Sequence, residues 1–239
     1  MTHIAQLKSK RTVAESTTAF YFSRPEGFTF KPGQAVDLIL PDPKHPGAEG
    51  ERHAFSLVGA PFQDELCITT RMRDTVYKRR LDALSLGASV QIDGPFGSLA
   101  LHGRSARAAV FIAGGIGITP FMSMLRQAAH EALPHQILLL YSNRRPEDAA
   151  FLGELQELER KNARFRLMAT MTQASKSAQA WTGEQAMVSG ELIKREITGL
   201  ADPIFYVVGP PAMVEALKGA LNQAGIDEDD IRSEEFYGY

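Results

Sequence analysis

The sequence contains a single cysteine, Cys67, among its 239 residues. One thiol cannot form an internal disulfide, a zinc site with four cysteine ligands or an iron–sulfur cluster held by four thiolates. We therefore expect no such cluster in the chain, and we assign no metal ligands among its residues. Because cysteine-poor proteins suit a reducing compartment, we also expect a cytoplasmic location.

Long apolar runs are missing as well. No segment approaches 18 uninterrupted apolar residues, and residues 1–10 lack the apolar stretch of a signal peptide, so we expect a soluble protein without a membrane span. A basic excess is also absent, since 26 Lys and Arg stand against 28 Asp and Glu. Nucleic acid is therefore not an expected partner.

The chain is long enough for one large domain or two of ordinary size, at about 150 residues per domain. Up to residue 102 it consists of short β-rich segments separated by Pro and Gly, which is typical of a small antiparallel barrel. The expected strands are 18–22, 35–40, 54–58, 65–70 and 89–93, with one helix at 76–86.

From residue 108 onward, apolar strands alternate with amphipathic helices, and this pattern predicts a parallel sheet covered on both faces. The expected strands are 108–113, 136–141, 166–170 and 204–208, and the expected helices are 119–133, 146–161, 191–197 and 212–224. We predict two domains: an antiparallel β-barrel over residues 1–102 and an α/β domain with a parallel sheet over 103–239.

Two glycine-containing turns lie where strands of the second half end. Gly114-Gly-Ile-Gly-Ile-Thr-Pro120 opens a helix, where backbone N–H groups can approach a pyrophosphate, although such a turn also serves tight strand-to-helix packing. Gly209-Pro-Pro-Ala-Met213 precedes the last helix. Ligands of open α/β sheets bind at strand carboxyl ends, so the two turns predict a crevice; the alternative is that the second turn only joins two elements.

A third strand end carries the segment Tyr141-Ser-Asn-Arg-Arg145. Either guanidinium, of Arg144 or Arg145, has the geometry to bind a phosphate in two hydrogen bonds. The alternative is an ordinary solvated turn.

Taken in order, these motifs resemble the ferredoxin–NADP reductase superfamily of flavoenzymes. In the first half, Phe30-Lys-Pro-Gly-Gln34 resembles its F-x-P-G-Q element, Phe55-Ser56 the end of its R-x-Y/F-S flavin motif, and Asp93-Gly-Pro-Phe-Gly97 its G-P-x-G turn. In the second half, the Gly114 turn resembles G-G-x-G-x-x-P, the Gly209 turn C-G-P-x-x-M, and Glu235-Phe236 the C-terminal acidic-aromatic pair. The resemblance covers nearly the whole chain.

The resemblance implies an FAD-binding barrel followed by an NAD(P)-binding α/β domain. The activity it implies is hydride transfer from NADPH or NADH to FAD, then electron transfer to a separate acceptor such as a small iron–sulfur protein, a flavodoxin, a cytochrome or a small molecule. A flavin-bearing electron-transfer subunit with little activity outside a complex is the alternative. A nucleotide-binding sensor without chemistry is a third reading.

The resemblance also implies the site residues. Phe55 would pack on the isoalloxazine and Ser56 would offer its hydroxyl near the flavin N5, although both also fit an ordinary strand. The implied FAD-binding residues are Arg52, His53, Ala54, Phe55, Ser56, Thr70, Arg71, Val76, Tyr77 and Lys78. The implied nucleotide-binding residues are Gly114, Gly115, Ile116, Gly117, Thr119, Pro120, Asn143, Arg144, Gly209, Pro210 and Met213.

The implied catalytic set is Ser56, Thr119 and Phe236. Phe236 and Tyr239 are candidates to cover the flavin face, with a frayed tail as the alternative for Tyr239. The choice between NADH and NADPH stays open, with a lean towards NADPH because Arg144 and Arg145 lie at the expected sheet edge.

Three positions depart from the family pattern. His53 stands where the flavin-binding arginine is expected and Arg52 lies one residue earlier, so either His53 makes the contact or a β-bulge restores Arg52. Lys78 replaces the serine of many relatives, and Val208 replaces their cysteine. Neighbouring Arg79 and Arg80 are expected to be solvated.

Overall fold

A computed structural model describes residues 2–40 and 51–237 of the chain. It divides into two compact units, Met1–Ala100 with Thr119–Gln127, and Leu101–Ile118 with Ala128–Tyr239. The domain boundary expected between residues 102 and 103 stays a prediction.

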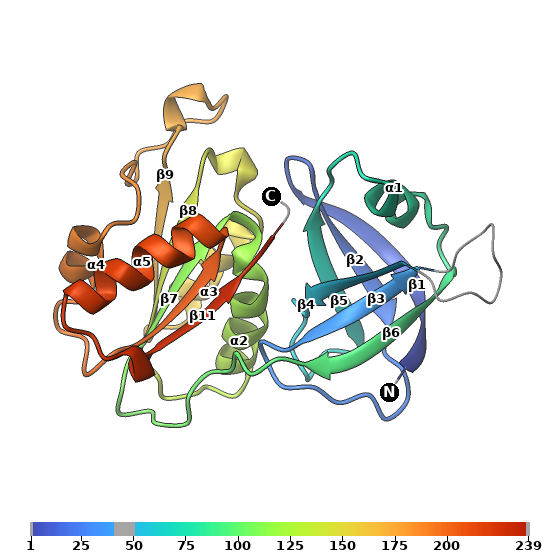
Figure 1. Ribbon diagram of the computed structural model, residues 1–239, viewed down its shortest axis with the longest axis horizontal. Helices are drawn as coiled ribbons and strands as arrows, with labels where there is room; N and C mark the ends of the chain where they lie inside the picture. The colour runs from blue at the N-terminus through green and yellow to red at the C-terminus, as the bar shows by residue number, and fades with distance from the viewer. Residues whose placement is uncertain (1, 41–50, 238–239) are drawn as a thin grey trace. The chain divides into compact units, whose positions relative to one another are not determined.

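The first unit is built on an antiparallel six-stranded sheet (Figure 1). Its strands, in the order β4-β3-β6-β1-β2-β5, have these bounds: β1 Thr2–Ala14, β2 Thr17–Ser23, β3 Ala35–Leu40, β4 Glu51–Ser56, β5 Glu65–Arg71 and β6 Ser89–Phe96. Because the edge strands β4 and β5 also contact each other, the sheet curls into a barrel. Helix α1, Val76–Ala83, connects β5 to β6.

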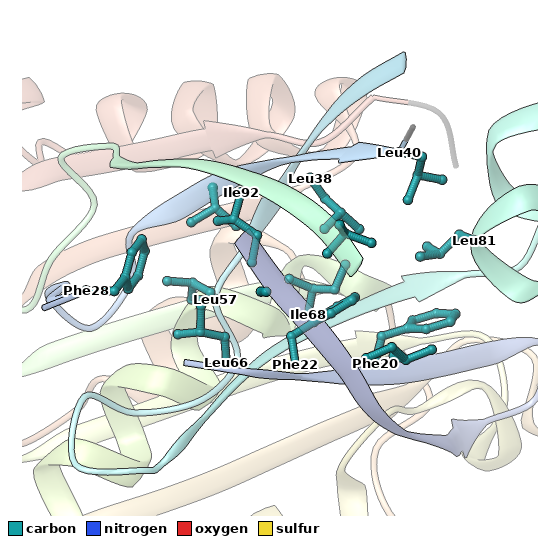
Figure 2. Packing of buried hydrophobic residues seen from close by; sticks show 14 of the residues in the cluster. Phe20, Phe22, Phe28, Leu38, Leu40, Leu57, Leu66, Ile68, Leu81 and Ile92 are labelled. Atoms are coloured by element: carbon teal, nitrogen blue, oxygen red, sulfur yellow. The ribbon is translucent and has the colours of Figure 1, made fainter. Parts of the chain in front are cut away.

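The barrel interior is filled by alternate side chains of its strands, which point inward with the two-residue period of β structure. Figure 2 shows Phe20 and Phe22 of β2 beside Ile68 of the neighbouring strand β5, in the same cluster as Leu38 of β3. Leu81 of α1 joins this cluster and attaches the helix to the barrel.

The second unit is a parallel five-stranded sheet in the order β11-β10-β7-β8-β9. Its strands are β7 Ala109–Gly114, β8 Ile137–Asn143, β9 Phe165–Met171, β10 Ile204–Gly209 and β11 Ile231–Glu235. Helix α2, Ile118–His130, follows β7 along the chain, although its residues Thr119–Gln127 are grouped with the first unit. Helix α3, Leu152–Lys161, follows β8. Helices α4, Gly190–Glu196, and α5, Pro211–Gln223, lie together against one face of the sheet (Figure 1).

The strand order places a topological switch between β7 and β10. The chain proceeds from β7 to β8 and β9, then returns to β10 on the other side of β7. The carboxyl ends of these parallel strands share one edge of the sheet, so the Gly114 and Gly209 turns become neighbours there.

The fold class predicted from the sequence is confirmed, while individual elements differ. The strand expected at 54–58 lies at Glu51–Ser56, and β1 and β11 were not predicted, because these strands are rich in polar side chains. The helix expected from residue 146 begins at Leu152, since Pro146–Asp148 forms a 3₁₀ turn and Phe151 adopts a left-handed φ of 62°.

Within the described residues, no helix combines the length and the apolarity needed to span a bilayer. Cys67 is buried in β5.

A buried histidine pair anchors the segment that leads into the second unit. The Nε2 of His102 lies 3.2 Å from the Arg107 carbonyl, and its Nδ1 lies 2.8 Å from the Tyr206 hydroxyl. Since a carbonyl only accepts, Nε2 donates, and the neutral ring then accepts the Tyr206 proton at Nδ1. His135 donates from Nε2 to the His102 carbonyl at 2.8 Å.

This pair predicts acid sensitivity. Burial, followed by the charges of His135 and Arg232, lowers the pKa of His102 below its ordinary value. As the pH falls below about 6.5, the His102 ring therefore takes up a proton in the unfolded chain before it does so in the folded chain. The free energy of unfolding decreases as a result, and His102 contributes at most about 1.4 kcal/mol per pH unit to this decrease. Chemical denaturation between pH 7 and pH 5 measures that decrease.

The matched comparison uses His102→Gln and His130→Gln. The first substitution removes the titrating ring and is expected to flatten the pH dependence, whereas His130 is exposed at the end of α2, so the second is expected to preserve it. Equal pH slopes for wild type and His102→Gln would contradict the assignment.

Candidate functional site

The register of β4 determines which residues of the expected flavin motif share a face. Its pairing with β3 runs unbroken from Leu40↔Glu51 to Ala35↔Ser56. Without a bulge, His53 and Phe55 lie on one face of β4 and Arg52 on the other. Of the two alternatives left by the sequence, the structure therefore excludes a bulge that would bring Arg52 to the face of His53.

Arg52 is engaged on its own face. Its Nη1 lies 3.0 Å from Asp37 Oδ2 and 3.0 Å from Asp93 Oδ2. Hydrogen bonds with these carboxylates raise the pKa of Arg52, and the bond with Asp37 has the larger effect. Ala54 shares this face and is exposed.

Aromatic rings gather on the other face of β4. The His53 ring lies 3.9 Å from the Tyr77 ring, and Phe55 is stacked on Tyr77 at 6.1 Å. Tyr77 is fully buried, its hydroxyl donates to the Leu38 carbonyl at 2.8 Å, and burial raises its pKa. These contacts hold the first turn of α1 against β4.

The ammonium of Lys78 lies beside the Phe55 ring of this aromatic cluster. It lies 4.9 Å from the centre of the Phe55 ring and donates to the Thr70 hydroxyl. Burial lowers the pKa of Lys78 to about 8, and no carboxylate of the described residues raises this pKa again. The structure thus brings together five expected flavin-site residues: His53, Phe55, Thr70, Tyr77 and Lys78.

The N-terminus of α1 begins beside this cluster. Thr75 caps it by accepting the Lys78 backbone N–H at 3.2 Å. The helix has no acceptor of its own for the N–H groups of Val76 and Tyr77, and Val76 is 59% exposed. These N–H groups are available to an anion.

Ser56 and Arg71 end the two edge strands. Ser56 is 6% exposed, and no described residue forms a hydrogen bond with its hydroxyl. Arg71 follows Thr70 and so lies on the opposite face of β5. The structure therefore separates the Arg71 side chain from the Lys78 cluster.

In the second unit, close packing explains two glycines of the Gly114 turn. A Cβ on Gly117 would lie 2.4 Å from the Val208 carbonyl oxygen, and one on Gly114 would lie 2.4 Å from the Met213 sulfur. Gly115 adopts a positive φ of 54°. Close packing against β10 and Met213 therefore accounts for Gly117 and Gly114, and nucleotide binding at the same turn stays a proposal.

The C-terminal strand reaches the same edge. The Phe236 N–H donates to the Gly209 carbonyl at 2.9 Å, so Phe236 lies beside the turn that contains Pro210 and Met213. Sequence reasoning selected Glu235 as the acidic partner of Phe236. The structure exposes Glu235 and instead buries one carboxyl oxygen of Glu234, whose pKa burial raises.

Asn143 is an unpaired amide at the carboxyl end of β8. The residue is buried, and neither its side-chain oxygen nor its side-chain nitrogen has a hydrogen-bond partner. Its strand pairs with the end of β7 through Gly114↔Ser142. Because buried amides almost always find partners, this site is suited to a ligand.

The two guanidiniums after Asn143 differ in availability. Arg145 forms two hydrogen bonds with Asp148, at 2.9 and 3.0 Å, and lies 3.4 Å from Glu147. Arg144 is 59% exposed and approaches Asp148 only at 4.0 Å. A hydrogen bond from Ser177 lowers the pKa of Glu147 and keeps its carboxylate charged.

The remaining expected residues are placed as follows. Ile116 lies in the 3₁₀ turn before α2, and Thr119 and Pro120 are buried in the first turn of α2. Tyr239 lies outside the described residues. In the part of the chain that the structure describes, no cluster of His, Cys, Asp and Glu is arranged to hold a metal ion.

Sequence reasoning missed three features of the site. The cap Thr75 was detectable, since a threonine before a helical segment is a known N-terminal signal. The pairing of Arg145 with Asp148 was also detectable from its three-residue spacing. The partners of Arg52 were not, because Asp37 and Asp93 become neighbours only through sheet pairing.

Comparisons with known proteins agree with this arrangement. The family described as the oxidoreductase NAD-binding domain matches residues 111–219. The chain is 28% identical to ferredoxin–NADP reductase B of Sorangium cellulosum, over 97% of this chain and 96% of that protein. It is 29% identical to the reductase component of propane 2-monooxygenase of Rhodococcus jostii, over 89% of this chain but only 57% of that protein.

The fold matches as well. A crystal structure of a ferredoxin NADP⁺ reductase from Neisseria gonorrhoeae, with bound FAD and NADP, superposes with a TM-score of 0.81 at 22% identity. The match covers 98% of each chain.

Proposed function

We propose that this chain is an FAD-dependent oxidoreductase of the ferredoxin–NADP reductase superfamily, which takes hydride from NADPH or NADH. The electrons then pass to a separate acceptor. The observation that carries the proposal is the similarity to the Sorangium reductase, which extends over 97% of the chain and so covers both units.

The first unit fits FAD. The flavin phosphates require cationic or N–H donors, and the described residues supply the desolvated Lys78 ammonium and the free N–H groups at the start of α1. Phe55 presents an aromatic surface for the flavin ring, and Ser56 presents an uncommitted hydroxyl.

The second unit fits a nicotinamide nucleotide. The unpaired Asn143 amide and the turns at Gly114 and Gly209 lie at the carboxyl edge of a parallel sheet, next to its topological switch. This is where open α/β sheets bind nucleotides. We assign Pro210, Met213 and Phe236 to the same site.

FAD, when bound, supplies the redox chemistry by accepting a hydride and releasing electrons. The role of the chain is to bind and orient the two cofactors and to exclude water. We propose a small iron–sulfur protein, a flavodoxin or a cytochrome as acceptor, since two of the similar proteins are a ferredoxin–NADP reductase and a reductase component of a monooxygenase. The cytoplasm is the proposed location, which suits the reduced thiol of Cys67.

Steady-state assays with FAD-loaded protein test the proposed activity. With NADPH or NADH and an artificial electron acceptor, oxidation of the nucleotide is expected to depend on both FAD and protein. A protein that binds FAD but oxidises neither nucleotide would contradict the proposal.

A flavin-bearing subunit of a larger complex is the second candidate. The observation that favours it is the 57% coverage of the Rhodococcus reductase component, which is a longer protein. Co-purification of a stable partner, together with negligible activity of the chain alone, would favour this candidate over the first.

Arg144 provides a prediction for nucleotide preference. Because Arg145 is held by Asp148, the exposed Arg144 is the guanidinium able to bind the 2′-phosphate of NADPH. Arg144→Ala is expected to raise KM for NADPH about tenfold, which corresponds to about 1.4 kcal/mol, and to leave KM for NADH unchanged. An equal change for both nucleotides would show that Arg144 does not read the 2′-phosphate.

A further inference from the structure

Three of the cations around β4, β5 and α1 are already paired with carboxylates. Arg52 is bound by Asp37 and Asp93, Arg79 contacts Asp74, and Arg80 lies 3.6 Å from Glu51. A paired guanidinium has less net charge to offer a phosphate, because the carboxylate must first be displaced.

Lys78 differs from these three cations. Its ammonium contacts a hydroxyl and an aromatic ring, those of Thr70 and Phe55, and no carboxylate of the described residues shifts its pKa. Burial makes the charged form costly, so an anion that arrives beside it recovers the lost solvation. This ammonium is therefore prepared to receive an anionic ligand.

The position of Lys78 indicates which anion fits. It is the third residue of α1, so its ammonium is carried by the same helical turn that offers the free N–H groups of Val76 and Tyr77. Its contacts, Phe55 and Thr70, are the residues proposed to lie along the flavin ring and its ribityl chain. The next group along FAD is the pyrophosphate, which carries a negative charge on each phosphate.

His53 is not an alternative cation at this place. Its ring packs against that of Tyr77, with 3.9 Å between the ring centres, and its Nε2 lies 3.2 Å from Glu51 Oε1, so the ring already has a carboxylate partner. Arg52 lies on the opposite face of the same strand.

We infer that Lys78 is the cation that binds the FAD pyrophosphate in this protein, in place of any basic residue of β4. The inference rests on the proposed function, since it names the group that holds the cofactor proposed there. The phosphate-binding charge thus comes from α1, and β4 contributes its aromatic face.

Binding of two flavins to the flavin-free protein tests the inference. FAD contains the pyrophosphate, and riboflavin contains the same ring and ribityl chain without any phosphate. Lys78→Met keeps an unbranched apolar stem over Phe55 and removes the charge. It is expected to weaken FAD binding about tenfold or more and to leave riboflavin binding unchanged. Fluorescence titration measures both dissociation constants.

Two further variants complete the experiment. Arg79→Met removes the next charge on the same helix, which is exposed and paired with Asp74, and is expected to leave both affinities unchanged. Lys78→Arg keeps a cation and is expected to restore most of the FAD affinity. Such a recovery would show that the missing charge, and not a folding defect, weakens FAD binding in Lys78→Met.

The outcomes separate this inference from the proposed function. Unchanged FAD binding by Lys78→Met, or an equal loss for FAD and riboflavin, overturns the assignment of Lys78 while wild-type FAD binding sustains the proposed cofactor. A wild-type protein that binds no FAD overturns both.

Discussion

Replacement of Gly117 by alanine is expected to disrupt the second unit and abolish nucleotide binding. The new Cβ would lie 2.4 Å from the Val208 carbonyl oxygen, 2.7 Å from the Val208 carbonyl carbon and 3.0 Å from the Gly209 nitrogen. All three are backbone atoms of β10, so the turn and the strand must move apart. A cost of about 3 kcal/mol, at the upper end of overpacking effects, would lower Tm by about 6–12 °C.

The control is another glycine of the same unit. Gly153 lies in α3, and a Cβ at this position would have no neighbouring atom within 4 Å, so Gly153→Ala is expected to raise helix stability by up to about 1 kcal/mol. Thermal unfolding of the two variants, with fluorescence titration of NADPH, makes the comparison. Normal stability of Gly117→Ala would contradict the close packing of the Gly114 and Gly209 turns.

Replacement of Ser56 by alanine is expected to slow flavin reduction about a hundredfold. The Ser56 side chain is nearly buried at the end of β4, and no described residue uses its hydroxyl. We propose that this hydroxyl is held for the reacting edge of the flavin, where it would donate a hydrogen bond as charge develops. Its loss would then raise the barrier to hydride transfer without weakening FAD binding.

Rapid-mixing measurements of flavin reduction by NADPH and NADH separate these effects. Ser89→Ala is the matched control, because Ser89 is exposed at the start of β6 in the same unit. Ser56→Ala with a wild-type reduction rate would show that Ser56 only packs the strand. A parallel loss of FAD affinity would indicate a binding role instead.

The general fold could be predicted because its signals are local. The apolar strands β7 and β10 appear in the sequence as short buried runs, and each is followed by a glycine turn and a helix. The polar strand β4 was misplaced because its residues are mostly exposed, and its alternation of faces only becomes clear once it is paired with β3.

The chemistry of individual side chains was harder to predict, since it depends on distant partners. Whether Arg52 or His53 faced the aromatic cluster depended on the β3–β4 register, which the sequence left open. The low pKa of Lys78 arises from burial beside Phe55 and Thr70, which other strands contribute. The unpaired amide of Asn143 likewise becomes visible only when every neighbouring donor and acceptor is placed.

Anaerobic mixing of FAD-loaded protein with NADPH, and separately with NADH, tests the central claim most directly. If the chain transfers hydride from a nicotinamide nucleotide to FAD, the visible flavin absorbance will bleach with at least one nucleotide and will return when an electron acceptor is added. A protein that retains FAD, binds the nucleotides and keeps its full flavin absorbance with both would contradict the account.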